Sequence, residues 1–187
     1  MKSIYHKRAN EINPEELNYL VENKIPGNQY LHFLDGSRFT VDDKYLKNLA
    51  KFVTALANAS GGLIVLGIKE KRRKACCFTG FNHELNDINI IYHHIISNSD
   101  PFPKNLQINN IRAGDDKDCL LISIAKAEFP LMFSDFRYYG IKDNKPVKLN
   151  SAEVSALFNR PLSNKLEIFS IYNTQGIPEM REGKYTS

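Results

Sequence analysis

A short run of basic residues is the strongest chemical signal in this sequence. Five cations occupy six consecutive positions around Glu70, namely Lys69, Lys71, Arg72, Arg73 and Lys74. Lysine and arginine bind phosphate groups, and the arginine guanidinium can donate two parallel hydrogen bonds to one phosphate. The run therefore predicts a contact with nucleic acid, with DNA as the expected partner. The alternative is a solvated turn, because most runs of like charge simply face water.

A basic residue outside this run, Arg137, lies among aromatic residues. Phe136 precedes it, and Tyr138 and Tyr139 follow it. Aromatic rings can stack on unpaired bases, so this segment predicts a further nucleic-acid contact through Arg137. The alternative, which we favour for the aromatic residues, is that they are buried on a strand.

The residues that could support catalysis are few. Glu70 and Asp43 are carboxylates that nothing in the sequence pairs with one another. His93 and His94 are adjacent on an expected helix, where neighbouring side chains diverge by about 100°. Together with an isolated His32, they do not form a metal-ligand pattern, and we predict no metal site. The sequence also has no phosphate-binding glycine motif and no nucleophile motif.

The composition sets the class of protein. The 187 residues are 42% hydrophobic and 25% charged, with a net charge of +4. This length and apolar content predict one globular domain with its own core. The odd cysteine count, with Cys76 and Cys77 adjacent and Cys119 apart, is typical of reduced thiols in the cytoplasm. The N-terminus has no apolar signal segment, and no apolar run is long enough to span a membrane.

The pattern of apolar residues predicts helices over 14–25, 41–59, 84–97 and 151–158. Strands are predicted over 29–34, 63–68, 75–78, 105–112, 119–124 and 137–141. The 63–68 run is continuously apolar and predicts a central strand buried on both faces. We expect an α/β (α+β) fold, a single domain whose mixed β-sheet is packed by helices. The expected divisions are an N-terminal segment over 1–27, the domain over 28–159 and a C-terminal tail over 160–187. An apolar stretch in the tail could form a homodimer contact.

Residues 52–68, FVTALANASGGLIVLGI, resemble the core signature of the Schlafen AlbA-like DNA-binding domain family. The looser similarity extends over residues 28–158. The resemblance implies the family's α/β fold and a role in nucleic-acid binding or transcriptional regulation. Some relatives are labelled ATP-binding, which implies a nucleotide as a possible ligand. Within the signature, Asn58, Gly61, Gly62 and Gly67 are interpreted as residues of a structural turn, because phosphate cradles usually lie at a helix N-terminus.

The same resemblance bears on catalysis. The RNA-cleaving relatives carry three acidic residues that hold a divalent metal. The matching positions here are Gly27, His32 and Glu70, so only the third is acidic. The resemblance therefore implies a binding module without catalysis more strongly than a metal-dependent ribonuclease. A dimeric protein-interaction module that uses the C-terminal tail is a further alternative.

Overall fold

The computed structural model describes residues 4, 7–81, 87–114 and 117–160. Its helices are α1 Pro14–Glu22, α2 Asp43–Ala59, α3 Asp87–Ser97 and α4 Ser151–Phe158. Its strands are β1 Leu31–Leu34, β2 Gly61–Leu66, β3 Ile68–Lys71, β4 Lys74–Phe78, β5 Ser99–Asp100, β6 Gln107–Ala113, β7 Lys117–Ala125, β8 Met132–Phe133, β9 Arg137–Lys142 and β10 Lys145–Lys148.

The central sheet has the strand order β1-β2-β7-β6. β1 runs parallel to β2, whereas β2 with β7 and β7 with β6 are antiparallel. The sheet is therefore mixed, as predicted. A second sheet has the order β10-β9-β8-β5, and β3 with β4 forms a separate hairpin.

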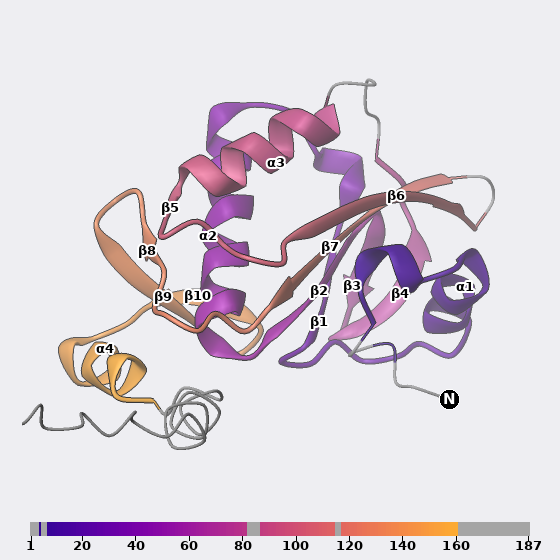
Figure 1. The fold of residues 1–187 in the computed structure, drawn as a ribbon. Coiled ribbons are helices and arrows are strands. Elements are labelled where there is room, and N and C mark those ends of the chain that lie inside the picture. The colour runs from indigo at the N-terminus through magenta and orange to yellow at the C-terminus, as the bar shows by residue number, and fades with distance from the viewer. Residues whose placement is uncertain (1–3, 5–6, 82–86, 115–116, 161–187) are drawn as a thin grey trace, which may run out of the picture.

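Both faces of the central sheet are covered (Figure 1). α2 and α3 lie over one face, and α1 lies with the β3–β4 hairpin over the other. Successive residues of β2 alternate between the two cores, since Leu63 and Val65 pack with α1 while Ile64 and Leu66 pack with α2. All four are fully buried, which confirms the doubly buried central strand.

The predicted elements differ from the structure at several points. The expected 63–68 strand breaks at Gly67, because β2 ends at Leu66 and β3 begins at Ile68. A Cβ atom at Gly67, whose φ is 113°, would lie 2.9 Å from Cys119 Sγ. The chain can thus pass close to β7 and turn into the hairpin only with glycine at this position. The short strands β5, β8 and β10 were not predicted, and the part of the third predicted helix over 84–86 lies outside the described residues.

Candidate nucleic-acid interface

The basic run forms the outer half of the β3–β4 hairpin. Lys71 pairs with Lys74 across the ladder, so Arg72 and Arg73 form its two-residue tip. The remaining predicted cation, Lys69, lies on β3. All five cations are exposed, and the structure brings them together on one hairpin.

The tip has an unusual backbone conformation for its residues. The φ angles of Arg72 and Arg73 are 54° and 62°. Positive φ at both central positions is the mark of a type I′ turn, which strongly prefers Asn, Asp and Gly. A residue such as arginine loses about 1 kcal/mol or more in this conformation. The fold has therefore accepted backbone strain at the two positions that project furthest from the hairpin.

The preceding segment holds this hairpin in place. Gly27 N donates to Arg73 O at 3.0 Å, and Ala75 N donates to Ile25 O at 2.9 Å. Ile68 at the base of the hairpin and Ala75 next to its closing Lys71–Lys74 pair are both buried. These contacts give the cations a fixed position on the surface.

Two acidic residues contact the ends of the basic run. Lys69 Nζ lies 3.6 Å from Asp35 Oδ2, and Arg73 Nη2 lies 3.7 Å from Asp143 Oδ1. The pKa of Asp35 is lowered, mainly by the hydrogen bond from the Ser37 hydroxyl and to a lesser degree by the Lys69 charge. The Arg73–Asp143 pair is 69% and 84% exposed, and exposed pairs of this kind contribute little. Among the described residues, the middle of the run has no acidic partner.

The β9–β10 turn lies beside the hairpin tip. Its two residues, Asp143 and Asn144, also have positive φ, at 49° and 60°. Here the residue types are those that the type I′ turn prefers. This neighbour is not evident from the sequence, because no apolar pattern predicts β10.

Arg137 lies apart from this surface. It begins β9, whereas the Asp143 that contacts Arg73 follows the last residue of β9. Five residue steps along a strand separate these ends by about 16 Å. Among the neighbouring aromatic side chains, Phe136 is 83% exposed, Tyr139 is buried, and Tyr138 packs edge-on against Phe158 at 5.4 Å. A stacking surface for bases is therefore limited here to Phe136.

Of the three positions that match the family's acidic residues, 27 and 70 are in contact with each other, and position 32 lies on β1. A Cβ atom built on Gly27 would lie 3.2 Å from Glu70 Oε2, so these two positions are in contact. His32 is buried on β1, with its ring edge-on to Phe52 at a centroid distance of 5.0 Å. Its pKa is lowered by burial. The described residues contain no group of three or more His, Cys, Asp or Glu side chains that could hold a metal ion.

The signature residues support the fold. The Asn58 amide donates to Leu131 O at 2.8 Å and Tyr139 O at 3.0 Å, and its Oδ1 accepts from Leu131 N at 2.7 Å. These bonds tie the end of α2 to the second sheet. A Cβ atom would lie 2.6 Å from Ile124 O at Gly61 and 2.8 Å from Tyr30 O at Gly62. Glycine therefore lets the chain pass close to β7 and to Tyr30 as it enters β2.

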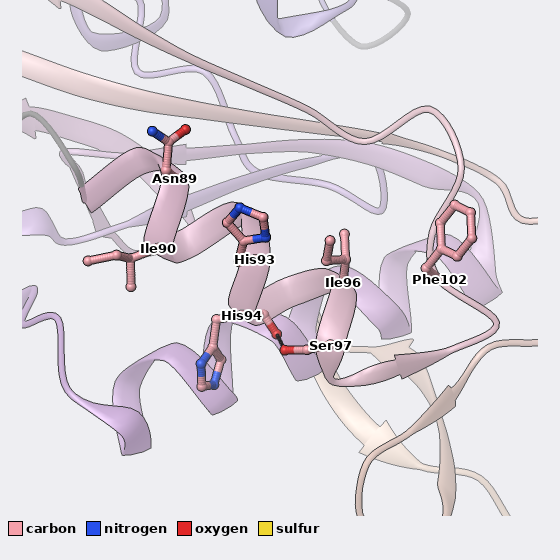
Figure 2. A pocket seen from close by; sticks show the side chains of 7 residues that line it. All are labelled: Asn89, Ile90, His93, His94, Ile96, Ser97 and Phe102. Atoms are coloured by element: carbon pink, nitrogen blue, oxygen red, sulfur yellow. Dashed lines mark hydrogen bonds between the residues drawn. The ribbon is translucent and has the colours of Figure 1, made fainter.

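A shallow hollow also lies along the outer face of α3. Figure 2 shows His93 and His94 pointing to different sides of this helix, as their adjacent positions predict. His94 Nε2 lies 3.9 Å from Asp43 Oδ1 on α2. Ile90, at 44%, and Phe102, at 62%, supply exposed apolar surface to the hollow. Nothing about these side chains assigns a ligand to this face.

The fold and the exposed hairpin define an α/β domain with a concentrated cationic surface. The profile of the Schlafen, AlbA_2 family matches residues 37–150, which is more than half of the chain. The chain belongs to this family. The match includes the hairpin and the whole of the 52–68 signature.

A solved structure supports the fold. The crystal structure of the DIP2311 protein from Corynebacterium diphtheriae matches with a TM-score of 0.51 and 18% sequence identity. The match covers 74% of this chain and 27% of that chain. No curated protein matched the sequence. In the part of the chain that the structure describes, no helix combines the length and apolarity needed to cross a bilayer.

Proposed function

We propose that this domain is a nucleic-acid-binding module of regulatory type that grips phosphates with the β3–β4 hairpin. Membership of the Schlafen, AlbA_2 family fits a nucleic-acid-related role. The observation that carries the proposal is the pair Arg72 and Arg73 at a strained two-residue tip. Strained residues persist where the surrounding structure holds them and a function benefits. Two arginines at this tip do not stabilise the fold. Their guanidinium groups project from a hairpin of fixed position and can bind phosphate oxygens.

The proposal is binding without cleavage. The family's metal-dependent chemistry would need carboxylates beside Glu70 to hold the metal and activate water. Position 27 lies against Glu70, but glycine offers no ligand there. His32 is buried against Phe52 and is also not a carboxylate. Glu70 is the one residue of the three that could contribute.

The test is fluorescence anisotropy with labelled duplex DNA, single-stranded DNA and RNA at low and moderate salt. We expect salt-sensitive binding by the wild type and its loss in the Lys71→Glu/Arg72→Glu/Arg73→Glu variant. A Lys44→Glu/Lys47→Glu/Lys104→Glu variant is the matched control, because it makes the same charge change at exposed lysines on α2 and before β6. Equal loss of binding in both variants would show an effect of net charge alone. Absence of binding to all three probes would contradict the proposal.

Cleavage is tested in the same samples by adding magnesium or manganese. The labelled strands should remain intact after long incubation. Cleavage that is abolished by a chelator and by Glu70→Ala would overturn the non-catalytic part of the proposal and support a nuclease.

A further inference from the structure

A polar hollow of about 580 Å³ opens at the end of the central sheet where β2 begins and β7 ends. The described residues that line it include three cations and no acid. The groups that could contact a ligand are Arg8, Tyr30, Ser60, Asn105, Gln107 and Lys126. Hollows of this size are typical of sites for small molecules.

The charges of the hollow are available to a ligand. Lys7 is the exception, because its Nζ pairs with Glu16 Oε1 at 2.5 Å. Arg8 and Lys126 are exposed, and neither side chain forms an ion pair with a described residue, although the Arg8 backbone N donates to Glu11 Oε2 at 2.9 Å. Two cations that converge on a hollow without an acid favour an anion.

The end of α2 does not oppose an anion there. A helix C-terminus normally presents carbonyl oxygens with partial negative charge. In this structure three of them accept hydrogen bonds: Leu56 O from Ser60 N at 3.1 Å, Ala57 O from Ala127 N at 2.8 Å, and Asn58 O from Arg160 Nη1 at 2.8 Å. The Arg160 guanidinium adds a positive charge at this helix end.

Neutral groups in the hollow indicate more than a bare phosphate. Gln107 lines the hollow, and its Oε1 is buried without a hydrogen-bond partner among the described residues, so a ligand N–H or O–H would satisfy it once the amide turns toward the hollow. The Tyr30 backbone is held firmly, because its N donates to Asn28 Oδ1 at 2.8 Å and its O accepts from Leu63 N at 2.7 Å. The Tyr30 ring therefore offers an aromatic surface from a fixed backbone position.

The hollow also lies near the hairpin tip. Arg73 O accepts from Gly27 N, and Tyr30 follows Gly27 by three residues, which span at most about 10 Å. A strand that contacts the tip can thus reach the hollow over the 27–30 segment.

We propose that this hollow binds one nucleotide unit, with its phosphate on Arg8 and Lys126 and its nucleoside beside Tyr30 and Gln107. The unit is either the 5′-phosphorylated end of a bound strand or a free nucleoside monophosphate. The strand-end form rests on the proposed function, whereas the free form does not.

The experiment is isothermal titration with four probes: adenosine 5′-monophosphate, adenosine, and a short single-stranded DNA with and without a 5′-phosphate. The proteins are the wild type, Arg8→Ala/Lys126→Ala, the hairpin triple variant, and the control Lys44→Ala/Lys148→Ala, whose two lysines are exposed and do not line the hollow. Adenosine should bind at least about tenfold more weakly than its monophosphate. The Arg8→Ala/Lys126→Ala variant should weaken monophosphate binding by about tenfold or more, and the control should leave it unchanged.

The two sources give different results. Preference for the 5′-phosphorylated strand that disappears in Arg8→Ala/Lys126→Ala assigns the site to a strand end. Binding of the monophosphate without that preference assigns it to a free nucleotide. If the monophosphate does not bind and strands with and without a 5′-phosphate bind equally well, this inference is wrong. That holds even where the hairpin triple variant still loses strand binding. Unchanged strand binding in the hairpin triple variant would instead count against the proposed function.

Discussion

Replacing the hairpin tip by Asn–Gly should make the protein more stable and a weaker binder. In Arg72→Asn/Arg73→Gly, both residues suit the positive φ angles of 54° and 62° that the turn requires. The change also removes the two charges that project furthest from the hairpin. Stability and binding should therefore move in opposite directions, which a simple loss of folding could not produce.

The size of the stability effect follows from the backbone. Left-handed strain costs an ordinary residue about 1–2 kcal/mol, and partial relief of it at the two positions is worth about 1–2 kcal/mol in total. Glycine reduces that gain in stability by about 0.5–1 kcal/mol, because it increases the conformational entropy of the unfolded chain. The lost Arg73–Asp143 pair is highly exposed and contributes little. A net gain of about 1 kcal/mol corresponds to a rise in Tm of about 2–4 °C for a chain of this length.

The size of the binding effect follows from counterion release. Each phosphate neutralised contributes about 0.9 to the slope of log K against log salt on duplex DNA. Loss of two arginine contacts should therefore make the slope shallower by about 1.8. The assay is anisotropy over a series of salt concentrations, with thermal unfolding of the same samples.

The charge-preserving control is Arg72→Lys/Arg73→Lys, which should keep the salt slope and gain no stability. An Asn–Gly variant with the salt slope and affinity of the wild type would refute the proposal that phosphates bind to this tip. A variant less stable than the wild type would refute the argument that the arginines strain the turn.

Three further predictions concern the core. Asn58→Ala should lower the free energy of unfolding by about 3–4 kcal/mol, because three buried backbone groups lose their partner. Asn58→Asp should be equally unstable, since its carboxylate would face two carbonyl oxygens. Urea unfolding of both variants checks this prediction. Burial lowers the pKa of His32, so the unfolded chain takes up a proton at higher pH than the folded one. Stability should fall as the pH drops below about 6.5, and His32→Leu should reduce that fall in unfolding curves at pH 5 and 7.5. Burial also raises the pKa of the Cys119 thiol to about 11, so a thiol reagent at pH 8 should label the exposed Cys76 and Cys77 rapidly and Cys119 only on unfolding.

The sequence predicts the elements whose own residues determine them. The apolar stripe of α2 and the continuous apolar run of β2 each contain enough buried side chains to define their element. The missed strands β5 and β8 have two residues each, and β10 carries a proline at position 146. Strands this short owe their pairing to neighbours rather than to a local pattern, so periodicity does not reveal them.

The arrangement of the candidate site residues can be predicted from the sequence only in part, for a similar reason. Charge density along the chain identified the hairpin cations directly. The contact of Gly27 with Glu70, the proximity of Asp143 to Arg73, and the separation of Arg137 all depend on how distant segments pack. The hollow beside Tyr30 is assembled from five separate parts of the chain, and no spacing in the sequence predicts it.

The two adjacent hairpin turns provide an internal comparison. Both have two residues with positive φ, and the Arg73–Asp143 pair joins them. The β9–β10 turn uses Asp143 and Asn144, which relieve the strain of that conformation. The β3–β4 turn has two arginines instead, although Asp and Asn would suit its backbone conformation equally well. Because the backbone requirement is the same, turn geometry alone does not explain the difference. The proposed phosphate partner, which binds guanidinium groups, would explain it, and it would replace the weak Arg73–Asp143 contact.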